Sequence, residues 1–322
     1  MKTTHIAAAL AIACFMGMSG MGMSDAAQAA DKITVARSGI DIAFAPIEVG
    51  EEAKIWEKNG IDLHVIDIPG TRIETVLTSG DAQVGLGAGI ALSARLKGVP
   101  TIAVASIAGP PYNLTIIVPT QSPIKKATDL KGKIVAVSTA GSLTDWLVRE
   151  VSRQEGWGSD GIKIAPLGDE TSRMAALRSG GVDANVAALM QAFERQDQGQ
   201  ARIITYFGDV VKDFQSLVIK ASDKVIADEP DLLKRFLKGW FESVAYMKAH
   251  KDVGTKVIAA TWKIDPVAVD KAYDIEMKMM SDDGVFKTAD MEVIRHSLVD
   301  MKVLEKMPEM HDLYTDRFVP VK

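Results

Sequence analysis

The stretch that decides the fold, KIVAVSTAGSLTDWLVREVSRQEGW, covers residues 133–157. It opens with a short apolar run typical of a β-strand and closes with the apolar spacing of an amphipathic helix. A turn of small and hydroxyl-bearing residues, STAGSLTD, joins the two. The stretch therefore predicts a strand, a tight turn and a helix, the unit from which sheets with helical crossovers are built.

The same order of elements repeats on both sides of this stretch. Strands and helices are expected to alternate within each unit, because short β-branched runs alternate with longer helix-like segments that end in glycine. Upstream these segments are KITVARSG (32–39), APIEVGEEAKIWEKNG (45–60), IDLHVIDI (61–68), TRIETVLTSG (71–80) and AQVGLGAG (82–89). Downstream they are IKIAPLG (162–168), ETSRMAALRSG (170–180) and VDANVAAL (182–189).

The two units also end alike. VLTSGDAQVGLG (76–87) and ALRSGGVDANVAAL (176–189) both give an apolar helix end, Ser-Gly, Asp-Ala and a short apolar strand. A glycine that ends a helix before a buried strand explains each copy, and chance similarity is the alternative. The repeat predicts two lobes of similar βαβαβ topology. Ligands of such sheets lie beyond the carboxyl ends of the strands, so two facing lobes would enclose a cleft.

Two extended runs are the predicted connections between the lobes. They are TIAVASIAGPPYNLTIIVPTQSP (101–123) and DFQSLVIKAS (213–222), and after the second the pattern becomes wholly helical. We predict an α/β protein of two lobes, each a mainly parallel sheet flanked by helices, joined by two crossing strands. Residues 30–115 and 218–322 would form lobe 1, and residues 116–217 lobe 2.

The first 29 residues are predicted to be a secretory signal peptide. They carry an early lysine, a short apolar run and the small-x-small site Ala27-Gln28-Ala29. An N-terminal membrane anchor and lipid attachment at Cys14 are the alternatives, and the domain is exported with either a cleaved signal or a lipid anchor. We expect cleavage and a location in the periplasm. The formal net charge of −5 argues against a nucleic-acid surface.

No enzyme motif emerges from the sequence. The five histidines are scattered, with neither an H-E-x-x-H metal pattern nor a G-x-S-x-G elbow. The only cysteine is Cys14, so the mature chain would have no cysteine nucleophile or thiolate metal site. We therefore expect no catalytic residues, no metal and no cofactor.

Taken together, the leader, SGDAQVGLGAG (79–89), PIKKATDLKGKIVAVSTAGSLTDWLVREV (123–151) and IADEPDLLKRFLKGWFESVAYM (226–247) resemble the type II periplasmic solute-binding proteins of ABC importers. The closest group is the nitrate/sulfonate/taurine type, which is similar to the thiamine-precursor binding proteins. The resemblance implies two lobes that close around a small molecule. It also implies delivery of that molecule, by what we expect to be a monomer, to a membrane permease driven by an ATPase.

Two enzyme classes share this fold or its relatives. The thiamine-pyrimidine synthases carry a cysteine-rich iron-binding motif, and porphobilinogen deaminase needs a cysteine for its cofactor. The mature chain has no cysteine, which argues against both. A ligand sensor that signals to a membrane receptor stays open as an alternative.

The turn in the opening stretch is the first candidate for ligand contact. If a helix begins near Ser142, its first turn exposes unpaired N–H groups and partial positive charge. Gly141 lets a ligand approach the backbone, and Ser142 and Thr144 add hydroxyls. In the resembling family the matching turn lines the cleft. The alternative is that Ser142 only caps the helix.

Other candidates come from the remaining turns. Ala88 and Gly89 are expected to face the cleft, although GLGAGIAL (85–92) is equally consistent with a structural turn and lacks the third glycine of a dinucleotide motif. Phe44 and Tyr112 either stack on the ligand or pack internally. Ala188 and Met190 would add an apolar wall.

The same turns favour an organic ligand with one anionic or polar end. Their apolar residues suit a hydrocarbon or aromatic body, and these turns contain no arginine, which a small hydrated anion usually needs. Sulfonates, carboxylates, nitrate and pyrimidines are the classes considered.

Overall fold

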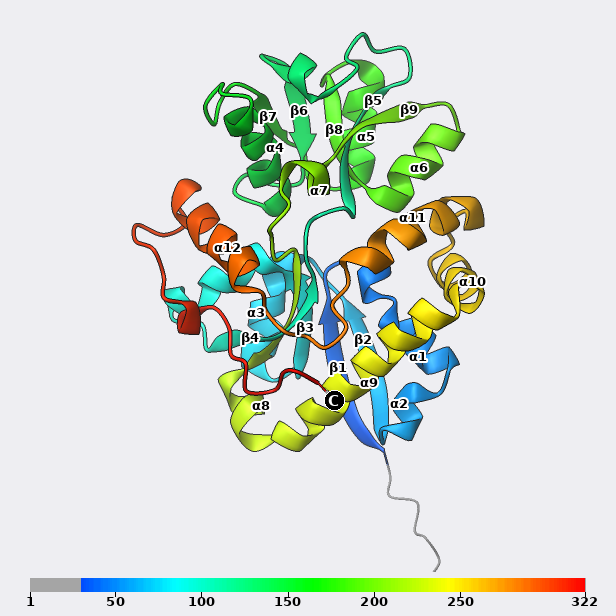
Figure 1. The fold of residues 1–322 in the computed structure, drawn as a ribbon, viewed down its shortest axis with the longest axis vertical. Helices are drawn as coiled ribbons and strands as arrows, with labels where there is room; N and C mark the ends of the chain where they lie inside the picture. The colour runs from blue at the N-terminus through cyan, green and yellow to red at the C-terminus, as the bar shows by residue number, and fades with distance from the viewer. Residues whose placement is uncertain (1–29, 322) are drawn as a thin grey trace, which may run out of the picture.

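The computed structural model describes residues 30–321, which form two lobes, each built on a five-stranded sheet (Figure 1). The predicted signal peptide and Cys14 lie outside the described residues. Within residues 30–321, no helix has both the length and the apolar run needed to cross a bilayer. The predicted α/β fold of two sheets flanked by helices is confirmed.

The lobe 1 sheet has the strand order β2-β1-β3-β10-β4. β1, β2 and β3 run parallel, and β10 enters antiparallel between β3 and β4. The bounds are β1 (Asp31–Arg37), β2 (Ile61–Asp67), β3 (Val84–Ala88), β4 (Thr101–Ala108) and β10 (Leu217–Ser222).

The lobe 2 sheet repeats this plan with the order β7-β6-β8-β5-β9. β6 pairs in parallel with β7 and β8, and β5 is the antiparallel insert. The bounds are β5 (Leu114–Pro119), β6 (Ile134–Val137), β7 (Lys163–Pro166), β8 (Ala184–Ala188) and β9 (Ala201–Tyr206). Equivalent parallel strands of the two lobes are therefore β1 and β6, β2 and β7, and β3 and β8.

The repeated helix endings form as predicted. α3 (Ile73–Ser79) ends at Gly80, with φ of 85°, and α5 (Glu170–Ser179) ends at Gly180, with φ of 75°. Both glycines adopt the left-handed conformation that favours glycine after a helix. In each lobe the chain then turns directly into the middle strand of the sheet, β3 in lobe 1 and β8 in lobe 2.

The prediction of one continuous helix over residues 45–60 is wrong. It breaks into α1 (Pro46–Glu52) and α2 (Ile55–Lys58), with Lys54 between them at φ of 56°. The break turns the Trp56 ring inward, where its indole N–H donates to the Ile47 carbonyl at 2.9 Å and its ring stacks on Phe236. Burial of a large aromatic side chain therefore outweighs the helical continuity that the sequence pattern suggested.

The expected long bridging strand is also divided. β4 belongs to the lobe 1 sheet and β5 to the lobe 2 sheet, and residues 109–113 join them. The return passes through the short helix α7 (Phe207–Val210) and residues 211–216. The predicted lobe bounds at 115 and 217 fall one or two residues inside β5 and β10.

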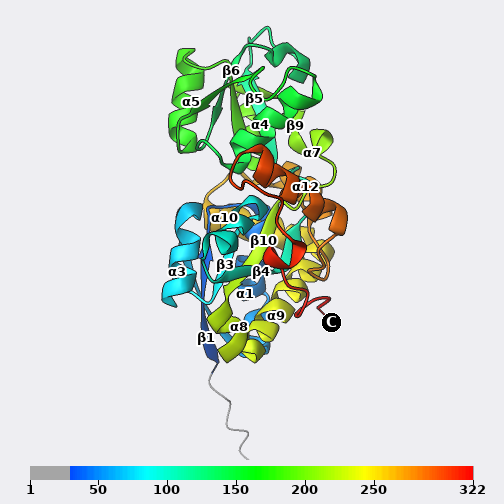
Figure 2. The same cartoon turned by 90° about the vertical axis from the view of Figure 1, so that its left-hand side faces the viewer.

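Helices complete both lobes, and some of them reach across the gap between the lobes (Figures 1 and 2). α6 packs on α11, and the apolar cluster at this contact joins Leu189, Met190 and Phe193 of lobe 2 to lobe 1 side chains. α12 shares a second cluster with α4. The bounds are α4 (Leu143–Gln154), α6 (Leu189–Asp197), α8 (Asp223–Asp228), α9 (Pro230–Ala249), α10 (Lys251–Trp262), α11 (Pro266–Met279) and α12 (Thr288–Asp300).

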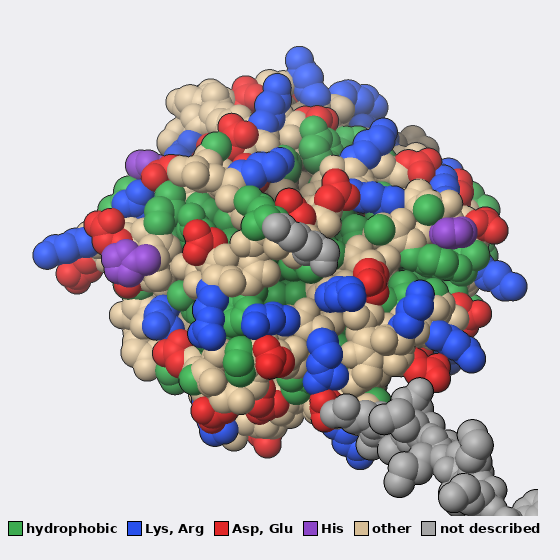
Figure 3. Space-filling model, turned by 60° about the horizontal axis from the view of Figure 1, so that its bottom comes forward, with side chains coloured by type: hydrophobic (Ala, Val, Ile, Leu, Met, Phe, Trp, Pro, Cys, Tyr) green, Lys and Arg blue, Asp and Glu red, His purple; other side chains and the backbone are tan. Residues whose placement is uncertain are grey.

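The face of lobe 1 remote from lobe 2 carries interspersed charges of both signs (Figure 3). This mixture agrees with the modest net charge of −5 over the whole chain. Such a surface favours solubility over strong attraction to a polyanion.

Candidate ligand-binding cleft between the lobes

A cavity of about 980 Å³ lies between the two sheets, where the carboxyl ends of their parallel strands face each other. Loops after β1, β2 and β3 supply the lobe 1 wall, and loops after β6 and β7 supply the lobe 2 wall. Val303, beyond α12, adds a contact from the C-terminal segment. The wall includes Ser38, Gly39, Asp67, Ile68, Pro69, Gly70, Thr71, Ile73, Ala88, Ala91, Ser93, Lys97 and Lys220 from lobe 1, and residues 138–143, 168–170 and Arg173 from lobe 2.

The turn after β6 forms a cluster of three hydroxyls. The Ser138, Ser142 and Thr144 hydroxyl oxygens lie 2.9–3.0 Å from one another. Ser142 is the N-cap of α4 and accepts from the Asp145 N–H at 3.4 Å, while Thr144 accepts from the Ser138 N–H at 3.0 Å. The capping alternative for Ser142 is therefore observed. Capping and cavity contact coexist, since Ser142 also lines the wall.

The backbone at this turn is partly committed within the protein. The Gly141 N–H donates to the Asp145 carboxylate at 2.8 Å, and Asp145 in turn pairs with Arg149 at 2.7 Å. A ligand at the turn thus meets hydroxyl groups and the remaining first-turn N–H groups rather than a full set of free donors.

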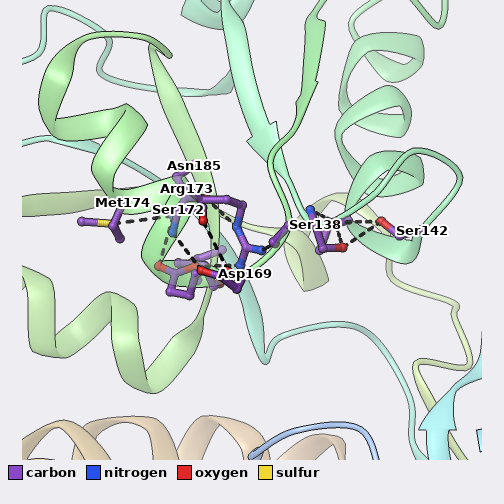
Figure 4. Close-up of polar contacts among 12 residues, drawn as sticks. Ser138, Ser142, Asp169, Ser172, Arg173, Met174 and Asn185 are labelled. Carbon is purple, nitrogen blue, oxygen red and sulfur yellow. Dashed lines mark hydrogen bonds and ion pairs between the residues drawn. The ribbon is translucent and has the colours of Figure 1, made fainter. Parts of the chain in front are cut away.

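The turn after β7 brings Arg173 into the wall (Figure 4). Its guanidinium donates to the side-chain amide oxygen of Asn185 at 3.0 Å, to the Glu170 carboxylate at 2.7 Å and to the backbone carbonyl of Gly168. These contacts use three of the five N–H donors of an arginine and leave two for a ligand. Asp169 caps α5 by accepting from the Ser172 N–H at 2.9 Å.

The two carboxyl groups of this turn respond differently to their surroundings. Burial raises the pKa of Glu170, and the neighbouring Arg173 opposes that shift. The backbone N–H of Ser172 lowers the pKa of Asp169. Glu170 is paired with Arg173, whereas Asp169 keeps its charge and is held by the Ser172 N–H and hydroxyl.

Lobe 1 contributes two charged networks. Asp67 lies at the cavity rim and accepts from the Arg37 guanidinium at 2.8 and 3.1 Å, and Arg37 also donates to Glu48 at 2.5 Å. Lys220, on the antiparallel strand β10, is 2% exposed and forms an ion pair with Glu74 of α3. Lys220 is therefore a buried cation at the floor of the cavity.

Three of the predicted site residues line this cavity: Ala88, Gly141 and Ser142. Thr144 lies behind them, with its hydroxyl bonded to Ser138 and Ser142. Gly89 faces elsewhere, because a Cβ at this position would overlap the Gln215 carbonyl of the second crossing segment.

The other four predicted residues lie away from the wall. Phe44 and Met190 are 2% and 1% exposed in the apolar core, and Ala188 is the half-buried last residue of β8. Tyr112 packs its ring on Gly208 and donates to Asp209 at 3.1 Å, so it joins the two crossing segments. For Phe44 and Tyr112 the structure shows internal packing, and the apolar wall expected from Ala188 and Met190 is supplied by Ile68, Pro69, Ile73, Leu143 and Val303 instead.

Sequence reasoning missed the loops after β2 and β7 and the charged residues Arg173 and Lys220. A signal for the loops was present, since the carboxyl end of every parallel strand belongs to the ligand-binding edge. Lys220 also stood out as a lysine inside the apolar strand LVIKAS (217–222). Among residues 30–321, no group of three or more His, Cys, Asp or Glu side chains is placed to hold a metal ion.

A relative and two solved structures share features with this chain. A Haemophilus influenzae protein named for thiamine biosynthesis is 24% identical over 217 residues, which cover 64% of this chain and only 65% of that protein. The periplasmic aliphatic sulphonate binding protein SsuA of Escherichia coli has a TM-score of 0.75 and 18% identity, covering 88% of this chain and 92% of its own. The desulfurization enzyme DszB has a TM-score of 0.66 and 20% identity, covering 89% and 97%.

The two solved structures share this fold but differ in activity, since one is a binding protein and the other is an enzyme. At such identities the structures establish a common fold. The sequence profile of the NMT1/THI5-like family, by contrast, matches residues 41–253, which include most of both lobes. The chain belongs to the NMT1/THI5-like family.

Proposed function

We propose that the chain is an exported solute-binding protein that captures a small organic molecule and delivers it to an ABC import permease from the periplasm. The cavity between the facing carboxyl ends of two like sheets carries this proposal. Its volume of about 980 Å³ lies at the upper end of the range typical of small-molecule sites. The likeness to a periplasmic sulphonate-binding protein supports the same role.

The wall supports a ligand with one anionic or polar end and an apolar body. Lobe 2 offers hydroxyls at Ser138 and Ser142 and two remaining N–H donors of Arg173. Apolar contacts come from Ile68, Ile73 and Val303. Arg173 and Lys97 supply positive charge to the wall, which suits an anionic end on the ligand.

Closure of the lobes is the proposed mechanism of capture. Lobe 1 residues would bind first, and rotation about residues 109–113 and 207–216 would bring the Ser138–Ser142 turn and Arg173 onto the ligand. A ligand that contacts both lobes stabilises the closed arrangement by its differential affinity for that state. The permease would then recognise the surface that closure creates.

A thermal-shift screen of the protein lacking residues 1–29 tests the proposal. The panel contains alkyl and aryl sulfonates, taurine, aromatic carboxylates, nitrate and thiamine-type pyrimidines. A ligand at a hundredfold excess over its Kd should add about 2.7 kcal/mol to the free energy of unfolding, which gives a readily measured rise in Tm. A hit should also compact the protein in small-angle X-ray scattering.

The outcomes of the screen separate the alternatives. A selective, saturable hit accompanied by compaction supports capture by closure. Conversion of the hit to a new product, followed by mass spectrometry, would instead indicate an enzyme. A full panel without any shift would count against an organic-anion binding protein.

The double variant Ser142→Ala, Thr144→Ala should weaken binding of such a hit. Only Ser142 lines the wall, so the loss of one ligand hydrogen bond is expected, which costs about 0.5–1.5 kcal/mol or roughly 2- to 13-fold in Kd. Thr144→Ala removes the neighbouring hydroxyl that orients Ser142. Calorimetric titration measures it. The matched control is Ser222→Ala, which removes the N-cap serine of α8 outside the cavity wall. Equal affinity of the double variant and the control would place the anionic end elsewhere.

A further inference from the structure

Two acids, Glu276, which is buried, and Asp41, which is half-buried, lie beside the start of the first crossing segment. Glu276 of α11 is 1% exposed, and its carboxyl contacts that of Asp41, which precedes the short helix η1 (Ile42–Phe44). Asn113, the last residue before β5, is 4% exposed and completes the cluster. None of the three lines the ligand cavity, although Asp41 lies two residues beyond Gly39, which does.

Asn113 is bonded to both lobes through this cluster. Its side-chain amide donates to Asp41 of lobe 1 at 2.6 Å. Its backbone carbonyl accepts from the Leu189 N–H, at the start of α6 in lobe 2, at 2.8 Å. Asp41 also accepts from the Ala43 N–H at 2.9 Å. The orientation of the crossing segment therefore depends on the acid pair.

One oxygen of the pair lacks a donor. Glu276 Oε2 is buried without a hydrogen-bond partner, as is Asn113 Oδ1. Two carboxylates in contact inside a protein cannot both be ionised at low cost, because their like charges repel and burial disfavours each charge. A proton on Glu276 would convert its unpartnered oxygen into a donor to Asp41.

The directions in which the two pKa values are shifted agree with a proton on Glu276. Burial raises the pKa of Glu276 well above its usual value, and the adjacent Asp41 raises it further. Burial also raises the pKa of Asp41, while the bonds from Asn113 and Ala43 oppose the shift. Asp41 is thus the group that carries the charge and Glu276 the group that holds the proton, and the two titrate as one unit.

We propose that Asp41 and Glu276 share a single proton and together act as positioning residues for Asn113, holding the first crossing segment in the geometry from which the lobes close. The link to closure rests on the proposed function, whereas the shared proton does not. Loss of that proton would place two adjacent charges beneath Asn113 and loosen its attachment to lobe 1.

Other titratable groups lie on the elements around the pair, and most have partners of their own. Lys271 of α11 pairs with Asp197 of α6 at 2.5 Å, and Lys251 pairs with Asp270 and Asp274 of α11 at 3.0 and 2.8 Å. The remaining groups on these elements are Glu194 and Arg195 of α6, Asp252 and Lys256 of α10, Lys278 and Tyr273 of α11, and Tyr112 of the crossing segment. The pH response is therefore assigned by variants of the pair itself.

The test compares Tm from pH 5 to 8, without ligand, for the wild type, Glu276→Gln and Asp41→Asn. A raised pKa in the folded state means that folding binds a proton, so wild-type stability should fall as pH rises above the usual Glu range. Glu276→Gln keeps a neutral side chain with a donor, and its Tm should gain on the wild type as pH rises. Asp41→Asn should lower Tm by several degrees throughout, about 2–4 °C for each kcal/mol lost. The control is Asp274→Asn, an exposed carboxyl on the same helix, which should follow the wild type.

Infrared difference spectra provide a direct readout of the proton. The carbonyl stretch of a protonated carboxylic acid should be present at neutral pH in the wild type and absent in Glu276→Gln. The shared proton would be overturned if Tm changed with pH in the same way in the wild type and Glu276→Gln and the wild type lacked the carboxylic-acid band. A saturable rise in wild-type Tm with sodium or calcium that is lost in Glu276→Gln would overturn it too, since a cation would then occupy the cluster.

The positioning role is measured separately, with a ligand from the screen. Asn113→Ala should reduce affinity and the compaction seen in scattering, while Asp274→Asn should change neither. Wild-type affinity and compaction in Asn113→Ala would overturn the positioning role. If the wild type itself bound nothing in the panel, the proposed function would fail, and the pH curves would still decide whether the proton is shared.

Discussion

Replacing Lys220 by methionine should lower the free energy of unfolding by about 3 kcal/mol or more, because it leaves one member of a buried ion pair without its partner. Lys220 is 2% exposed, and its ammonium pairs with Glu74. The Glu74 side chain is 17% exposed, which places the expected loss at the low end of the range for buried pairs. A fall in Tm of about 6 °C or more is the measured sign.

The second oxygen of Glu74 sets the control for this experiment. It accepts from the Thr101 hydroxyl at 2.5 Å, so Glu74→Gln retains an acceptor for Thr101 while removing the charge. The double variant Lys220→Met, Glu74→Gln should recover most of the lost stability, since replacing both members of a buried pair is often close to neutral. A double variant as unstable as the single one would show that Lys220 acts through packing of its hydrocarbon stem.

The sequence predicted the parts of the fold that depend on neighbouring residues. Gly80 and Gly180 end helices in left-handed conformations, as the repeated Ser-Gly pattern indicated. Ser142 begins α4, as a serine before an amphipathic run indicated. Each of these features is decided within a few residues, and the glycine ending recurs at the same place in both lobes.

The break between α1 and α2 shows where local reasoning fails. Glutamate and lysine residues from Glu51 to Lys58 suit a continuous helix, but Trp56 needs a buried site against Phe236, which lies on α9 far along the chain. Tertiary packing of one aromatic ring therefore overrides the helical pattern. No property of residues 45–60 alone contains that information.

The cavity wall was harder to predict for a similar reason. Phe44 and Met190 follow strands, where ligand contacts are expected, yet both side chains turn into the core. Lys220 and Glu74 are 146 residues apart in sequence and meet only because β10 inserts beside β3. A strand end predicts a place on the binding edge, but not the direction of each side chain.

Gly89 illustrates a glycine that is required for a reason other than ligand approach. A side chain there would overlap the Gln215 carbonyl, where the second crossing segment passes the end of β3. The Gly89 N–H donates to the Ser216 carbonyl of that segment at 2.9 Å. The small residue allows a connection between the lobes to run close to a strand end that itself lines the cleft through Ala88.

Arg173→Ala should reduce both stability and ligand affinity. Its guanidinium holds Gly168, Glu170 and Asn185 together, and the Arg173 and Glu170 side chains are only 11% and 24% exposed. Leaving Glu170 unpaired should cost about 3 kcal/mol of unfolding free energy. Loss of a charged hydrogen bond to an anionic ligand should cost about 1.5–3 kcal/mol of binding free energy, or roughly 10- to 150-fold in Kd. Chemical unfolding and calorimetric titration measure the two losses separately.

The double variant Glu170→Gln, Arg173→Ala distinguishes scaffold from ligand contact. Removing the unpaired carboxylate should restore most of the stability. In the wild type the Asn185 amide donates to the Glu170 carboxylate at 3.1 Å, and the side-chain carbonyl oxygen that Glu170→Gln retains can accept the same bond. Affinity should stay low, since the two spare guanidinium donors remain absent. Arg173→Lys should keep the charge but lose the fork that spans Gly168 and Asn185, and so give an intermediate affinity. If affinity returned together with stability in the double variant, Arg173 would only shape the wall, and the anionic end of the ligand would depend on the Ser138–Ser142 turn alone.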